Sequence, residues 1–229
     1  MKHVLGFAAV AAAATLTLTA CGEQDTAEPT SAPAAQPATT EALAPAAAPA
    51  APAGIPAGYT EEDFYALFGS IESPGVPTVT PPQCTPLAFD SSTLVEWGAV
   101  PPEQKPVTMY TSAGEQMVFV RQDAELAGFD AAGCESFTRE NTTPLGTTVT
   151  TYTTAPIDVN VPGADRAQGF TQTVTGVTLD GTDMGAMKAG EQSTLLVVEA
   201  GDNTYFVAGS GGATVDDVTT LAQANIAQG

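Results

Sequence analysis

Residues 22–57 of this 229-residue chain contain almost nothing that a folded domain could bury. From Gly22 to Ala57 the sequence is mainly alanine, proline, threonine, glutamate and serine, with a proline every few residues. A segment of this composition cannot recover the entropy that ordering costs, so we expect a disordered tether biased towards polyproline II. The fold must therefore be built from residues 58–229, which suffice for one domain with a buried core.

Residues 1–20 have the parts of a bacterial export signal, with a positive start at Lys2 and His3 and then an apolar run. The run is too short and too rich in alanine to span a membrane, which needs about 20 strongly apolar residues. It ends in Leu18-Thr19-Ala20-Cys21, which matches a lipobox. The pattern predicts cleavage before Cys21 and thioether lipidation of that cysteine. The alternative is an ordinary secretory signal in which this cysteine is incidental.

Lipidation of Cys21 would place the protein at a membrane. Each acyl chain, such as palmitate, adds ~0.8 kcal/mol of membrane affinity per buried CH₂. We therefore expect a lipoprotein anchored to the extracytoplasmic face of the cell membrane, with the membrane itself as a partner. The expected domains are a signal peptide (1–20), the lipidated cysteine with its tether (21–57) and a globular domain (58–229).

The charge of the chain excludes several classes of function. It has 26 acidic residues against 6 basic ones, a net charge of −20. Such a surface repels phosphate backbones and anionic lipid surfaces, which excludes nucleic-acid binding. The only histidine, His3, lies in the signal segment, so the mature chain lacks His-based triads, Cys–His dyads and the commonest zinc ligand. We expect no metal site, no cofactor and no enzymatic activity.

Two cysteines remain once Cys21 is assigned to the lipid anchor. Cys84 and Cys134 are an even pair in a chain expected outside the cytoplasm, which predicts a disulfide. A redox-active or metal-binding pair would instead favour Cys-x-x-Cys spacing, which these two cysteines lack.

The pattern of the remaining residues predicts an α+β fold. Thr60-Glu61-Glu62-Asp63 is typical of a helix start, and an apolar stripe from Phe64 to Ile71 follows it. A second capping pattern at Thr214 precedes a final helix. We expect an antiparallel β-sheet with the helices packed mainly on one face. The expected strands are 107–111, 115–122, 136–141, 147–154, 170–179, 193–199 and 203–208, with a short helix within 123–133.

The order of these features resembles a known family. A proline-led cysteine, Thr80-Pro81-Pro82-Gln83-Cys84, is followed by two strands, a short helix and Cys134-Glu135-Ser136-Phe137. A long β-rich region and a closing helix complete the pattern. It looks like the sensor-like extracellular domain of actinobacterial lipoproteins and of some mycobacterial serine/threonine kinases. Over residues 58–228 the resemblance implies a helix-backed antiparallel sheet with a ligand cleft and no catalytic residues. The kinase-attached members commonly carry two disulfides, whereas this chain can form one.

Two loops could suggest catalysis or metal binding. Gly209-Ser210-Gly211-Gly212 does not match a nucleophile elbow, and a turn is the simpler interpretation. Asp180-Gly181-Thr182-Asp183 lacks the further ligands of a calcium loop, so we expect a hairpin turn there too.

Aromatic and basic side chains of the β-rich region are the candidates for a ligand cleft. Aromatic residues are usually core residues, but those that line a cleft would favour an apolar or glycolipid guest. Arg121 and Arg166 could orient an anionic head group, or could be ion-paired surface residues. The candidate cleft residues are Trp97, Tyr110, Phe119, Arg121, Tyr152 and Arg166.

These observations lead to three hypotheses about function. The first is a non-enzymatic module that binds or senses an envelope ligand, such as a lipid or a glycan. The second is an accessory lipoprotein that docks onto a membrane or cell-wall protein complex. The third is a hydrolase, which would need titratable groups with shifted pKa values converging in a cleft.

Overall fold

The computed structural model describes residues 54–71, 75–112, 115–185 and 189–228. They belong to one compact unit, residues 47–229. The lipobox, Cys21 and the expected tether up to residue 53 lie outside the described residues. No helix in the described part is long and apolar enough to cross a membrane.

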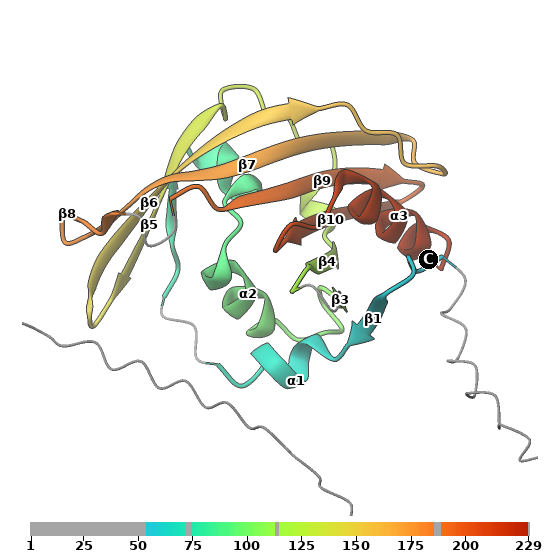
Figure 1. Ribbon diagram of the computed structural model, residues 1–229, viewed down its shortest axis with the longest axis horizontal. Helices are drawn as coiled ribbons and strands as arrows, with labels where there is room; N and C mark the ends of the chain where they lie inside the picture. The colour runs from blue at the N-terminus through green and yellow to red at the C-terminus, as the bar shows by residue number, and fades with distance from the viewer. Residues whose placement is uncertain (1–53, 72–74, 113–114, 186–188, 229) are drawn as a thin grey trace, which may run out of the picture. The chain divides into compact units, whose positions relative to one another are not determined.

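The described residues form one antiparallel sheet of ten strands, which confirms the expected sheet (Figure 1). Along the sheet the order is β1-β3-β4-β10-β9-β7-β6-β5-β2, and β8 pairs with β7. The strands are β1 (Tyr59–Glu62), β2 (Thr78–Thr80), β3 (Val107–Ser112), β4 (Met117–Gln122), β5 (Ser136–Thr143), β6 (Gly146–Ile157), β7 (Arg166–Leu179), β8 (Thr182–Asp183), β9 (Gln192–Ala200) and β10 (Asn203–Ser210). The helices are α1 (Phe64–Phe68), α2 (Ser91–Gly98) and α3 (Val215–Ile226), with 3-10 helices η1 (Pro82–Leu87) and η2 (Ala124–Leu126).

Two apolar cores lie on the two faces of the sheet. Side chains alternate between them along each central strand, so that Phe119 of β4 packs in one core and Val118 and Val120 in the other. The first core is completed by α1, η1 and α2, and the second by α3, which packs against β4, β9 and β10.

Packing mainly on one face, as expected from the sequence, is not shown, and the helices cover both faces. The reason is that the central strands are apolar on both sides, as in the buried run Leu195 to Val198 of β9. Each face then needs its own cover to keep water away from the strands.

The first expected helix begins later than the sequence suggests. Tyr59 to Glu62 pair with β3 as strand β1, and Tyr59 is buried in the second core. Asp63 then caps α1 by accepting a hydrogen bond from the Ala66 backbone N–H at 3.0 Å. Ile55 also packs against the second core, ahead of the expected boundary at residue 58.

The expected helix within 123–133 is reduced to the single turn of η2. Asp123 caps this turn, and Gly128 and Gly133 follow with φ angles of 71° and 79°. Left-handed backbone at these two glycines prevents a continuous right-handed helix.

The disulfide between Cys84 and Cys134 is confirmed. It joins η1 to the turn before β5, and both cysteines are fully buried. The link holds η1 against the sheet at one border of the first core.

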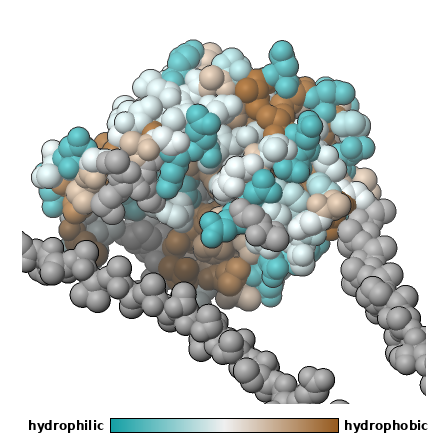
Figure 2. Space-filling model, in the orientation of Figure 1, coloured by the Kyte–Doolittle hydropathy of each residue, from teal (hydrophilic) through white to brown (hydrophobic). Residues whose placement is uncertain are grey.

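Apolar surface gathers over the region of α1 and α2 (Figure 2). Leu67 of α1 is 56% exposed, and Ile71, just after the helix, is 44% exposed. This part of the surface is therefore less polar than its surroundings.

Candidate functional site

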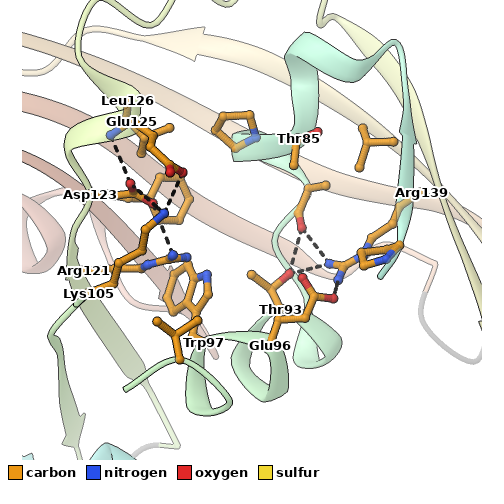
Figure 3. A pocket seen from close by; sticks show the side chains of 16 residues that line it. Thr85, Thr93, Glu96, Trp97, Lys105, Arg121, Asp123, Glu125, Leu126 and Arg139 are labelled. Atoms are coloured by element: carbon orange, nitrogen blue, oxygen red, sulfur yellow. Dashed lines mark hydrogen bonds and ion pairs between the residues drawn. The ribbon is translucent and has the colours of Figure 1, made fainter. Parts of the chain in front are cut away.

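A cavity of about 410 Å³ opens beside α2, between η1 on one side and β4 and β10 on the other (Figure 3). Most of its wall is apolar, and charged side chains face it from two sides. The apolar lining consists of Pro77, Val79, Pro86, Ala88, Trp97, Val100, Leu126 and Phe206.

Helix α2 positions three of the lining side chains: Thr93, Glu96 and Trp97. It begins with a capping box, in which Asp90 accepts hydrogen bonds from the backbone N–H groups of Ser92 and Thr93. Such a cap fixes the first turn and the direction in which the next turn presents its side chains.

Trp97 is the only tryptophan of the chain and is held firmly in the cavity wall. Its ring lies 5.7 Å from that of Phe206 in an edge-to-face arrangement and 5.8 Å from that of Phe89. The Arg121 guanidinium lies 5.0 Å from the centre of the Trp97 ring, a cation–π contact. One residue of the cavity is therefore both an aromatic wall and a partner of a cation.

One wall of the cavity carries two cations that share a carboxylate. Lys105 Nζ lies 3.1 Å from Asp123 Oδ1, and an Arg121 terminal nitrogen lies 3.2 Å from Asp123 Oδ2. Lys105 also contacts the Glu125 carboxylate at 2.6 Å. Burial lowers the pKa of Arg121 from its ordinary value, against the opposing effect of Asp123.

The opposite wall carries a buried arginine surrounded by acceptors. The Arg139 guanidinium donates to the Ala88 carbonyl oxygen at 2.9 Å and to Asp90 Oδ1 at 3.1 Å, and it also binds Thr93 and Glu96. Its side chain is 3% exposed. Burial raises the pKa of Glu96, although Arg139 beside it acts in the opposite direction.

The network continues behind this wall to Tyr152. The Tyr152 hydroxyl donates to Asp90 Oδ2 at 2.5 Å, and its ring stacks on Phe137 with the centroids 5.1 Å apart. Asp90 therefore serves at once as helix cap, partner of Arg139 and acceptor for Tyr152.

The structure brings together only part of the predicted cleft. Trp97 and Arg121 line the cavity, and Phe119 lies in the core behind them, 5.9 Å from Phe89 between ring centroids. Tyr152 is buried and is linked to the cavity lining through Asp90, which accepts a hydrogen bond from Arg139.

The other two predicted residues lie elsewhere. Tyr110 belongs to the core on the opposite face of the sheet, where its hydroxyl accepts a hydrogen bond from Asn225. Arg166 is 43% exposed on β7 and forms an ion pair with Glu199 at 3.1 Å. Arg166 is therefore an ion-paired surface residue, which was the alternative to a role in binding an anionic head group.

Sequence reasoning missed Lys105, Glu96, Asp123 and Arg139. One signal could have found Arg139, because it follows Phe137 by two residues on β5 and therefore points to the same buried face. A buried arginine needs acidic partners, so its position alone would have indicated an ion-pair network. Lys105 follows a proline-rich loop and gives no such signal.

A second cavity, of about 420 Å³, lies on the other side of α2. Its lining includes Phe89, Asp90, Gln172, Glu191 and Ser210, and no basic side chain among the described residues. Among the described residues, the two cavities share none in their linings. Within the described ranges, no group of three or more Cys, Asp or Glu side chains is placed to hold a metal ion.

No family model and no curated protein matches this chain. Among solved structures, the chain is similar to the extracellular domain of PknH from Mycobacterium tuberculosis. The two are 14% identical, the match covers 75% of this chain and 83% of that one, and the TM-score is 0.41. The family resemblance continues to rest on the placement of the cysteines and the order of elements in this sequence.

Proposed function

We propose that this domain is a non-enzymatic binding or sensing module that takes a small envelope ligand, such as a lipid or a glycan, into the cavity beside α2. The observation that carries the proposal is the cavity itself. Its volume lies in the range of small-molecule sites, and its lining is mainly apolar with a few charged side chains at fixed positions. Such a lining accepts an apolar group and orients it by its polar part.

The ion pairs of the charged groups support a binding role. Each acid that lines the cavity is engaged by a cation: Glu96 by Arg139, and Asp123 and Glu125 by Lys105. A carboxylate held in this way is fixed in position by its ion pair, which suits it to orient a bound ligand.

The expected location agrees with the buried disulfide. Disulfides form and persist in oxidising compartments outside the cytoplasm. We further propose that acyl chains on Cys21 anchor the protein at the extracytoplasmic face of the cell membrane, where envelope lipids and glycans are its natural ligands.

Trp97 provides a direct test, since all tryptophan fluorescence comes from the wall of the cavity. The protein is mixed with an envelope lipid extract and, separately, with a glycan fraction. We expect one of the two to change the Trp97 emission and to give an adduct in native mass spectra that is lost on denaturation.

The matched control is Val100→Phe, which adds bulk at the cavity wall. It should fold with a similar melting temperature and lose both the fluorescence change and the adduct. Unchanged emission and a bare mass with both fractions would contradict the proposal.

A second candidate function is docking onto a membrane or cell-wall protein. The apolar surface over α1 and α2, with Leu67 and Ile71 exposed, favours this candidate. It gains support if the cavity stays empty and Leu67→Glu abolishes capture of a specific membrane protein by the full chain.

A further inference from the structure

We propose that the ligand carries an anionic head group, which binds Lys105 and Arg121 at one wall of the cavity while its apolar part lies along the rest of the lining. This inference rests on the proposed function and narrows the ligand to an anionic amphiphile.

The distribution of positive charge points to this wall. The described residues include four basic side chains, and three of them, Lys105, Arg121 and Arg139, line this one cavity. The chain as a whole has a net charge of −20, so an anion is repelled by most of its surface. The cavity is therefore where an anionic group meets the least repulsion and the nearest donors.

The two charged walls differ in how far their cations are compensated. Arg139 is matched by two carboxylates, Asp90 and Glu96, so that its wall has an excess of negative charge. On the other wall Lys105 and Arg121 share the single buried carboxylate of Asp123. The anionic head group therefore binds at the wall that carries Lys105 and Arg121.

Glu125, the second ion-pair partner of Lys105, can be displaced by a ligand. Glu125 contacts Lys105, yet its side chain is 80% exposed, whereas that of Lys105 is 23% exposed. An exposed ion pair of this kind contributes little, about 0–1 kcal/mol, because water screens it. A ligand carboxylate or phosphate can take the place of Glu125 at Lys105 Nζ from inside the cavity.

Arg121 has hydrogen-bond donors that can bind the same anion. Among the described residues its ion pair goes to Asp123 alone, and its Nε, like that of Arg139, is buried with no hydrogen-bond partner there. Its guanidinium also stacks over Trp97, so an anion that draws on Arg121 must alter the surroundings of the indole ring.

Two probes of equal chain length separate the head group from the tail. Dodecanoate and dodecanol are titrated at pH 7, below micelle-forming concentrations, into the full chain carrying Cys21→Ala, and Trp97 emission is followed. We expect dodecanoate to bind about tenfold more tightly, the factor that one charge-assisted hydrogen bond supplies.

Three variants locate the effect. Lys105→Met should abolish the preference for dodecanoate and leave dodecanol binding unchanged, which also shows that the cavity is intact. Glu125→Gln should tighten dodecanoate binding by about threefold, because the competing carboxylate is gone. Arg166→Gln, at the described basic residue that lies outside the cavity, should have no effect.

The outcomes distinguish this inference from the proposed function. If neither probe binds, the apolar cavity is not a ligand site and both fail. If both probes bind equally, the proposed function stands and the anionic head group is refuted. A preference for dodecanoate that survives Lys105→Met also overturns the inference, since the anion would then bind elsewhere.

Discussion

At the level of single residues, the most consequential feature is the buried chain of polar groups from Glu96 through Arg139 and Asp90 to Tyr152. A guanidinium that is 3% exposed persists only when its charge is paired, because an unpaired buried charge costs several kcal/mol. Here the acceptors come from α2 and from the residues just before it, so the network ties α2 to β5 and β6.

Removing one hydroxyl from this network should be costly. Tyr152→Phe keeps the ring that stacks on Phe137 but leaves Asp90 without the donor at 2.5 Å. We expect the free energy of unfolding at pH 7 to fall by about 2 kcal/mol, measured by urea denaturation. The control is Tyr205→Phe, at a buried tyrosine whose hydroxyl has no partner within the described ranges, and it should cost much less. Equal losses in the two variants would contradict a special role for the Tyr152 hydroxyl.

Tyr152→Phe should also change how the free energy of unfolding depends on pH above pH 10. Burial, together with the nearby Asp90 carboxylate, raises the pKa of Tyr152 well above its ordinary value of 10.0. The folded state therefore keeps the phenol proton at pH values at which the unfolded chain has lost it. The stability from this group is complete below pH 10 and is lost as the pH rises towards the folded pKa. Tyr152→Phe should make the fall above pH 10 shallower.

The candidate site could be predicted from sequence only where a residue type is rare. Trp97 and Arg121 stand out because the chain has one tryptophan and few basic residues, and both line the cavity. Tyr110 was misplaced because an aromatic residue in a strand can face either core, and only the register of β3 decides between them. Lys105 and Asp123 come together through the pairing of β3 with β4, which no local pattern specifies.

At the level of elements, local sequence signals predicted well the helices and strands whose ends carry clear signals. The final helix has the expected capping box, in which Thr214 and Asp217 exchange hydrogen bonds. The expected strands from 107 to 208 are all present, and most are longer than predicted. The predicted start of the first helix at Thr60 was wrong. The residues of this acidic segment also fit an edge strand, and their pairing with β3 decided the outcome.

The disulfide makes η1 a fixed wall of the cavity. Cys84 lies in η1 next to Thr85 and Pro86, which line the cavity, and its partner Cys134 is 50 residues away in the sequence. We expect the double variant Cys84→Ala/Cys134→Ala to lower the free energy of unfolding by about 4 kcal/mol, because the unfolded chain regains the entropy of an open loop. Urea denaturation measures this loss.

A reducing agent supplies the control for the disulfide. It should lower the stability of the parent protein and leave the double variant unchanged. If parent and variant unfold at the same urea concentration, the bond does not contribute to the stability of this domain.

At the level of the whole molecule, the fold class was predictable but the arrangement was not. Alternating apolar residues indicate strands, and short turns indicate antiparallel neighbours, so the antiparallel sheet followed from local patterns. The placement of β10 between β4 and β9, and of β2 at the far border, depends on contacts between residues distant in sequence. Those contacts also place α3 on the face opposite α2.

The cavity can act at the envelope only if the chain is held there, and Cys21 is the residue that we expect to hold it. Cys21→Ala removes the thiol to which the acyl chains would attach, and with it the membrane affinity of ~0.8 kcal/mol per buried CH₂. We expect the variant to move from the membrane fraction to the soluble fraction on cell fractionation, while its Trp97 emission stays that of the parent. Cys84→Ala/Cys134→Ala is the matched control, because it removes cysteines but keeps the anchor, and it should remain with the membrane. A Cys21→Ala protein that still sediments with membranes would show that another part of the chain provides the attachment.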